Sequence, residues 1–240
     1  APALVMLKRL ILLIYLPILA ACAGGGTAPP RPAGTLFHPS QLAKTDIDRV
    51  AEAHQREIFL NLKLLTEKLY RRNPRELKKS GQTSLAAGVA RIFEGRHEWR
   101  FAELRGMRGA QAIHLAFSED YQGDRVLAFV AGLGGMIQTA FNDQTEFFML
   151  DDLDPQGLYN AARNVEIAVW KLSSTRTLQG ELFLLSNEGA GPVQNLSFER
   201  EFGKVIGSLD VLSKIVADKN QRTVVKVIQS LATAVFLPIK

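Results

Sequence analysis

A dense run of cations at residues 70–79, Tyr-Arg-Arg-Asn-Pro-Arg-Glu-Leu-Lys-Lys, could bind an anion. Each arginine presents a planar fork of N–H donors that fits phosphate and carboxylate groups. The run therefore predicts an anion-binding surface, and the alternative is an ordinary solvated basic face. The cations that would form this site are Arg71, Arg72, Arg75, Lys78 and Lys79.

A second polar group interrupts the apolar helical pattern of residues 155–172. An arginine or glutamate inside a bundle must be paired or hydrogen-bonded, because an isolated buried charge is strongly destabilising. The pattern predicts a buried polar network that either bonds helices together or, in an enzyme, forms a pocket around Arg163 and Glu166. The network would consist of Tyr159, Asn160, Arg163, Asn164 and Glu166.

The sequence lacks the common patterns for metal binding and covalent catalysis. None of the four histidines has another histidine three or four residues away, so no zinc site is expected. The run Asp152-Leu-Asp-Pro-Gln-Gly resembles the opening of a calcium loop, but Arg163 occupies the twelfth position, which requires a glutamate. We therefore predict no metal, no cofactor and no assignable catalytic residue, and leave open whether the chain is an enzyme.

The first 22 residues have the order of an export signal. Lys8 and Arg9 precede an apolar run at residues 10–19, and Leu19-Ala-Ala leads into Cys22, the only cysteine. This segment resembles the lipobox signal peptide of bacterial lipoproteins, whose common pattern is Leu-Ala-[Gly/Ala]-Cys. The resemblance implies that residues 1–21 are removed and that Cys22 carries lipid. The apolar run is shorter than the about 20 residues that cross a bilayer, which disfavours a transmembrane anchor.

The resemblance also implies a location. Residue 23 is alanine, whereas an aspartate there would retain an enterobacterial lipoprotein at the inner membrane, so we expect an outer-membrane protein that faces the periplasm. Residues 22–40 are rich in glycine and proline and predict a flexible tether. The expected partners are the membrane, through the lipid, and an envelope protein or an anionic envelope polymer. Export would exclude nucleic acid.

The net charge of +5 conceals a division along the chain. Residues 63–108 contain 12 Lys/Arg and 5 Asp/Glu, whereas residues 109–201 contain 5 Lys/Arg and 13 Asp/Glu. This division predicts either that the two segments attract each other within one fold or that one of them faces an anionic partner.

The spacing of apolar residues predicts a mainly α fold over residues 41–240: one globular bundle of about 6–8 helices, with one or two short strands at most. Thr45-Asp-Ile-Asp has the form of a capping box, and the helix that it begins should end before Pro74. Cap residues and spacing predict further helices at residues 74–80, 85–94, 125–142, 155–172, 198–217 and 221–236. Residues 110–117 and 177–185 fit a strand as well as a helix.

Two of these helices are unusually apolar. The helix at residues 155–172 is apolar on more than one side, so we expect it to be central. Residues 126–140 contain Gly132, Gly134 and Gly135, which destabilise a helix by about 1 kcal/mol each and indicate that a neighbour approaches closely.

Three functional hypotheses remain open. The tether and the divided charge favour a non-enzymatic envelope accessory or interaction protein. The alternatives are an enzyme that acts on cell wall or lipid, with its pocket near Arg163 and Glu166, and a carrier of an apolar ligand in a cavity lined by residues 126–140.

Overall fold

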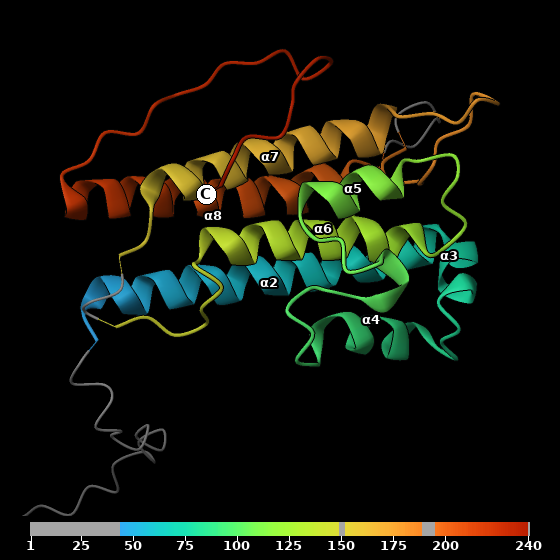
Figure 1. Ribbon diagram of the computed structural model, residues 1–240, viewed down its shortest axis with the longest axis horizontal. Helices are drawn as coiled ribbons and strands as arrows, with labels where there is room; N and C mark the ends of the chain where they lie inside the picture. Colours follow the sequence, from blue (N-terminus) through green and yellow to red (C-terminus); the bar gives the residue numbers. More distant parts are fainter. Residues whose placement is uncertain (1–43, 149–151, 189–194, 240) are drawn as a thin grey trace, which may run out of the picture. The chain divides into compact units, whose positions relative to one another are not determined.

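The computed structural model describes residues 44–148, 152–188 and 195–239, which belong to one compact unit. Within these ranges the chain forms seven α-helices and one short 3-10 helix, and its β-structure is limited to isolated bridges. The prediction of a single, mainly α domain is confirmed. The helices are α2 (Asp46–Arg72), α3 (Pro74–Lys79), α4 (Leu85–Phe93), η2 (Ala102–Leu104), α5 (Ala110–Ala116), α6 (Arg125–Ala140), α7 (Pro155–Ser174) and α8 (Ser197–Asn220), shown in Figure 1.

Local signals in the sequence set most helix boundaries. The Asp48 backbone N–H donates to Thr45 Oγ1 at 3.3 Å, and the Thr45 backbone N–H donates to the Asp48 carboxylate at 2.6 Å, so the predicted capping box is complete. Helix α2 ends at Arg72, just before the Asn73-Pro74 pair. Helices α6 and α7 also begin at predicted caps, because Asp124 and Asp154 each accept two backbone N–H groups from the first turn.

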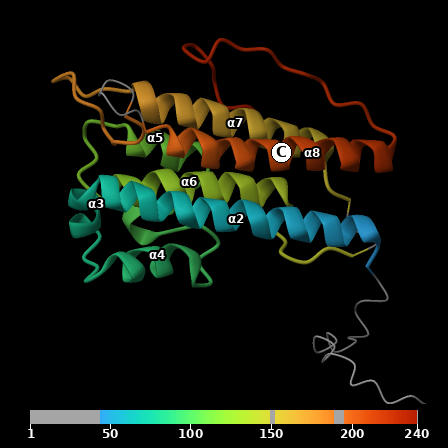
Figure 2. The same cartoon turned by 180° about the vertical axis from the view of Figure 1, so that it is seen from behind.

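Helix α6 lies at the centre of the domain. Every one of its residues except Thr139 is buried. Helix α5 packs along it, α2 and α7 flank it, and α8 packs against both α2 and α7 (Figures 1 and 2). Helix α7, which the sequence predicts to be central, is less completely buried than α6, although Ser173 is its only exposed residue. Helix α7 carries Arg163, Glu166 and Lys171, which need water or charged partners, whereas α6 has no charged residue after Arg125.

The glycines of α6 allow neighbouring segments to approach closely. A Cβ atom at Gly132 would lie 2.6 Å from Ile113 Cγ1, and one at Gly134 would lie 2.3 Å from the Trp99 ring. The close approach that the sequence predicts is present, although helix α5 accounts for only part of it and the Trp99 ring comes from an irregular segment.

The prediction of a final helix at residues 221–236 is wrong. This segment is extended apart from a turn at residues 231–233, and it passes over α7 (Figure 1). Asn164 donates to the Leu237 carbonyl at 2.8 Å and accepts from the Leu237 N–H at 2.6 Å, while Asn160 donates to the Pro238 carbonyl at 2.7 Å. The segment is rich in β-branched residues, which lower helix propensity, and α7 amides bind its backbone at residues 225, 237 and 238.

The two ambiguous segments take different forms. Residues 110–117 form helix α5 rather than a strand. Residues 177–185 form a turn, in which the Thr177 N–H donates to the Glu181 carbonyl at 2.7 Å, followed by irregular chain. Isolated antiparallel bridges join Arg176 to Leu182 and Glu188 to Asn195.

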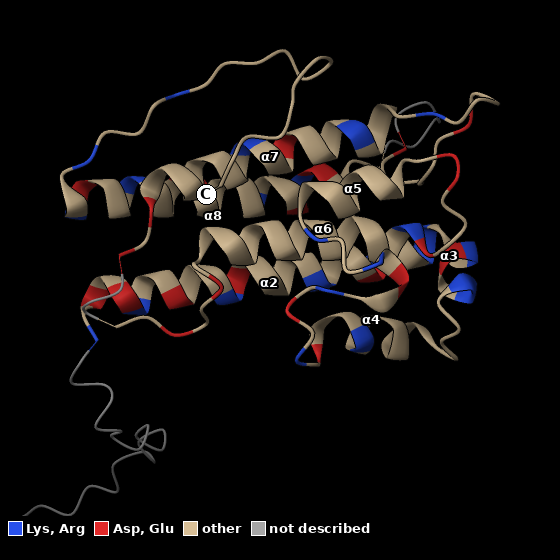
Figure 3. Cartoon of the chain, viewed as in Figure 1, with Lys and Arg blue, Asp and Glu red and all other residues tan. Residues whose placement is uncertain are grey.

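The basic and acidic segments meet within the fold (Figure 3). Arg72 pairs with Glu188 at 2.7 Å, Lys68 lies 3.8 Å from Glu201, and Arg108 pairs with Asp143. Attraction inside one domain therefore accounts for part of the divided charge. Among the described residues, no helix has the length and apolar character needed to span a membrane.

Candidate functional site

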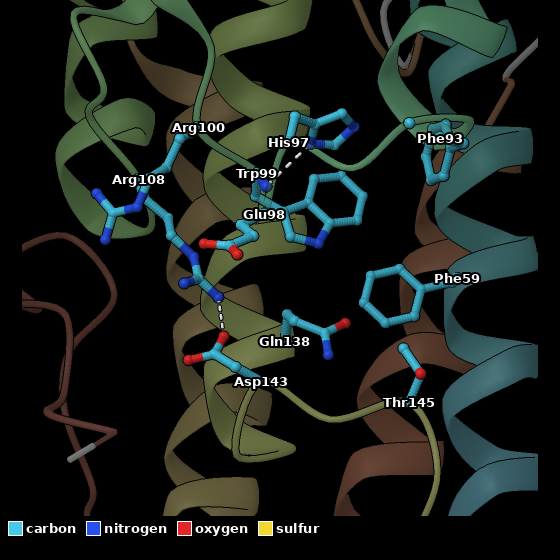
Figure 4. A pocket seen from close by; sticks show the side chains of 11 residues that line it. Phe59, Phe93, His97, Glu98, Trp99, Arg100, Arg108, Gln138, Asp143 and Thr145 are labelled. Atoms are coloured by element: carbon cyan, nitrogen blue, oxygen red, sulfur yellow. Dashed lines mark hydrogen bonds and ion pairs between the residues drawn. The ribbon is translucent and has the colours of Figure 1, made fainter.

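A cleft of about 590 Å³ combines buried and half-buried aromatic rings with charged groups, which is typical of a ligand-binding site (Figure 4). Its walls come from α2, α4, the segment that follows α4, the end of α6 and the loop after α6. The cleft is lined by Phe59, Phe93, Gly95, His97, Glu98, Trp99, Arg100, Arg108, Gln138, Asp143 and Thr145.

Trp99 organises the aromatic side of the cleft. Its indole stacks on Phe59 with ring centroids 5.4 Å apart and meets Phe93 edge-on at 5.6 Å. The six-membered ring of the indole lies against Gly134, where the Cβ of any larger residue would collide with it. Figure 4 shows the three rings together, facing the charged groups of the cleft. Such a surface suits an apolar or aromatic group of a ligand.

A strained turn places Trp99 in this position. Glu98 and Trp99 both adopt left-handed backbone angles, with φ of 50° and 61°, which are uncommon for residues other than glycine. His97 stabilises the turn, because its Nδ1 accepts the Trp99 N–H at 2.9 Å and its Nε2 donates to the Ile92 carbonyl at 2.9 Å. Burial lowers the pKa of His97, so the neutral ring that these two bonds require is favoured. Since both ring nitrogens are engaged, His97 positions the turn and is unsuited to proton transfer.

Arg108 forms the polar side of the cleft. Its guanidinium donates to the Gly135 carbonyl at 3.0 Å and pairs with Asp143. Its Nε is buried and has no hydrogen-bond partner among the described residues. Unsatisfied buried donors are rare in folded proteins and call for an explanation.

The apolar surface continues beyond the cleft along α2. A shallower groove of about 340 Å³ shares Phe59, Phe93 and Thr145 with the cleft and extends to Leu60 and Lys63. Leu60 is 61% exposed, which is high for a large apolar residue on a packed helix. The cleft and the groove together could accommodate a ligand longer than a single side chain.

The charged residues of the cleft are held in different ways. Glu98 and Arg100 are exposed at the cleft, and Arg108 is held by its own partners. Among the described residues, no three potential metal ligands lie close enough to hold an ion. Asp152 and Asp154, which imitate a calcium loop in sequence, bind Asn220 and the first turn of α7 respectively.

The cations predicted as an anion site lie elsewhere, where α2 ends and α3 begins. Arg72 pairs with Glu188, and Lys79 pairs with Glu76 at 2.7 Å. Arg71, Arg75 and Lys78 are exposed. None of these cations lines the aromatic cleft, but Arg72 and Arg75 line a separate hollow of about 840 Å³.

The structure divides the predicted α7 network into two parts. Asn160 and Asn164 are buried and bind the backbone of residues 237–238. Arg163 pairs with Asp210 at 2.7 Å and with Glu166 at 3.1 Å, and the Tyr159 ring lies beneath its guanidinium. Burial raises the pKa of Glu166, while the charge of Arg163 opposes that shift. The asparagines bond the C-terminal segment to the bundle, and the charged residues link α7 to α8.

Sequence reasoning missed the cleft because its main residues lie in an irregular segment. The run His97-Glu-Trp-Arg-Phe101 places charged and aromatic residues side by side between two helices, and this unusual composition was the available signal. A buried hydrogen-bond cluster at the start of α6 was also missed. There Tyr70 donates to Asp124 at 2.6 Å, and the Arg125 N–H donates to Glu76 at 2.7 Å.

The lipidation residue Cys22, together with the leader and the tether, lies outside the described residues. Comparison of the chain with family models, curated proteins and solved structures gave no match.

Proposed function

We propose that this chain is a non-enzymatic, lipid-anchored interaction domain of a bacterial envelope that binds a partner through the aromatic cleft. The observation on which this rests is the cluster of the half-buried Phe59 and Phe93 rings and the buried Trp99 ring, which lines a cleft together with the charged Arg100 and Arg108. Aromatic and arginine side chains are the residues that most often dominate binding at interfaces.

The charges around the cleft indicate the chemistry of the partner. Arg56 and Lys63 line the groove, and Arg100 and Arg108 line the cleft together with Glu98 and Asp143. Lys63 and Arg108 are paired with Glu94 and Asp143, whereas Arg56 and Arg100 have no acidic partner among the described residues. An extended peptide segment with an apolar side chain and a nearby carboxylate would match both the rings and the unpaired cations.

Site-specific crosslinking in intact envelopes tests this proposal. A photoreactive amino acid at Leu60, beside the groove, should give an adduct of one discrete mass. The same amino acid at Val211, an exposed apolar position on α8, is the matched control and should not. The adduct should disappear in Trp99→Ala and also in Arg100→Ala, which removes an exposed side chain and leaves the core intact. No adduct at Leu60, or equal adducts at both positions, would contradict the proposal.

The anchor and the absence of catalysis need separate tests. Mass analysis of the protein from its native host should show a diacylated or triacylated Cys22 at the new N-terminus, and an unmodified thiol with residues 1–21 attached would disprove the anchor. Turnover of wall or lipid substrates that is lost in Glu166→Gln, with folding preserved, would favour an enzyme instead.

A further inference from the structure

A second hollow, of about 840 Å³, lies at the end of the domain where α2 meets α3. Four arginines from three separate parts of the chain line it: Arg72 and Arg75 where α2 ends and α3 begins, Arg125 at the start of α6 and Arg176 in the turn after α7. Two carboxylates, Glu76 and Glu181, also line it, so the hollow has an excess of positive charge.

Arg125 forms a buried, positively charged part of the wall. It is only 9% exposed, and its guanidinium donates to the carbonyls of Ala116, Ser118 and Tyr121 at 2.7–2.8 Å. These acceptors are neutral, and no carboxylate of the described residues forms an ion pair with this guanidinium, although Glu76 and Glu119 attract it from a greater distance. The Phe183 ring lies 4.7 Å from its central carbon. Buried charges are normally paired, so this positive charge favours an anion in the adjoining space.

Two further guanidinium groups are available at the rim. Arg75 is exposed and makes no hydrogen bond or ion pair with a described residue, and Arg176 is exposed and donates only to the Gly180 carbonyl at 2.8 Å. Arg72, by contrast, is held by Glu188. Forked N–H donors on several sides match the oxygens of a tetrahedral phosphate.

The carboxylates differ in how strongly they would oppose an anion. The Glu76 carboxylate is buried, accepts from the Arg125 backbone N–H at 2.7 Å and pairs with Lys79, so its charge is compensated. Glu181 is exposed and forms no ion pair with a described residue. The apolar part of the wall includes Pro74, Leu182 and Phe183, and Asn73 and Thr177 also line the hollow.

We propose that this hollow binds a phosphate monoester, held by Arg75 and Arg176 at the rim and favoured by the buried charge of Arg125. The site is separate from the aromatic cleft and does not depend on its function. Two sources could supply this chemistry, a soluble phosphorylated metabolite or the headgroup of a lipid, and the apolar wall lies where the body of such a molecule would extend.

Titration calorimetry on the full-length purified chain tests the proposal with two probes that share one headgroup: glycerol 3-phosphate and water-soluble dihexanoyl phosphatidic acid. Saturable binding of either probe supports a phosphate site. A preference for the phosphatidic acid assigns the site to a lipid, and equal affinity assigns it to a soluble metabolite. No saturable binding of either probe overturns the proposal.

Matched variants distinguish the hollow from a general basic surface. Arg75→Ala and Arg176→Ala should each weaken binding by about tenfold, because each removes charged hydrogen bonds to the phosphate. Glu181→Gln should strengthen binding. Arg71→Ala is the control, since Arg71 is exposed at the same end of the domain but does not line the hollow. An equal loss in Arg71→Ala, with unchanged thermal unfolding in all variants, would show only nonspecific attraction and would overturn the site.

Discussion

Helices α6 and α7 begin with the same aspartate cap but are covered in different ways. Helix α6 is enclosed by side chains and by closely approaching backbone at its glycines. Helix α7 packs against α6 and α8, and its outer face is covered by the extended residues 224–239, whose backbone bonds to Gln156, Asn160 and Asn164. Glycines therefore allow neighbouring segments to pack closely on α6, whereas amide side chains form hydrogen bonds with the segment that covers α7.

The two helices are covered differently because the covering segments differ in whether their own backbone hydrogen-bonding groups are already paired. A helix satisfies its own backbone groups, so a neighbour such as α5 needs only complementary shape where it packs on α6. An extended segment brings unpaired N–H and carbonyl groups, and α7 must supply hydrogen-bond partners for them. Each mode of covering should consequently respond to a different kind of substitution.

The largest effect is expected where shape alone matters. Gly132→Ala should destabilise the fold by about 3 kcal/mol, because the new Cβ would lie under 3 Å from Ile113 and from the Gly109 carbonyl, which cannot easily move. Gly207→Ala, in an open part of α8, should instead stabilise the fold by about 1 kcal/mol. Urea unfolding gives the free energy of unfolding of both variants. Similar changes in the two would contradict the close approach on α6.

The two caps provide the next comparison. Burial raises the pKa of Asp124 from its usual 3.8 to about 6, despite the hydrogen bond from Tyr70. The folded state therefore binds a proton between these pH values that the unfolded state releases. The resulting stability is present below pH 4 and is lost as the pH rises through 6, a change of about 3 kcal/mol.

This effect is measured as the stability difference between the native chain and Asp124→Asn at a series of pH values. Between pH 4 and 7, the free energy of unfolding of the native chain should decrease relative to that of Asp124→Asn. Asp154→Asn changes the equivalent cap of α7 and is the matched control. A slope of equal size in that variant would show that burial of Asp124 is not its cause.

A smaller effect is expected where α7 binds the extended segment. Asn164→Ala removes two hydrogen bonds to Leu237 and should cost about 2 kcal/mol, with increased hydrogen exchange and proteolysis within residues 221–239. Helix α6 should keep its protection. Loss of protection in residues 221–239 and in α6 together would mean that the segment and the core unfold as one unit.

The smallest effect tests the extended conformation itself. Ile228 is 98% exposed, so Ile228→Ser should change stability by less than about 0.5 kcal/mol. Phe236 is half-buried and packs edge-on against His114, so Phe236→Ser should cost clearly more. A loss of about 2 kcal/mol or more in Ile228→Ser would instead indicate the packed amphipathic helix that the sequence pattern favoured.

The sequence identified the parts of the binding sites unequally. The cations around Arg75 are contiguous and were recognised from composition, but Arg125 and Arg176 join them only in the folded chain. The aromatic cleft was not foreseen, because Phe59 and Trp99 lie 40 positions apart and meet through a left-handed turn for which no glycine gives a signal.

The sequence by itself determined where most helices begin and end, because caps, prolines and apolar spacing act within a few residues of one another. Tertiary structure alone decided which helix became central, whether residues 221–239 coiled or extended, and which distant side chains form the two hollows. Those outcomes depend on which segments, far apart in the sequence, pack together most favourably. Hydrogen bonds from the α7 amides favour an extended backbone in residues 221–239, whereas the β-branched side chains of this segment disfavour a helix. The apolar spacing of the segment does not show which of the two conformations is more stable.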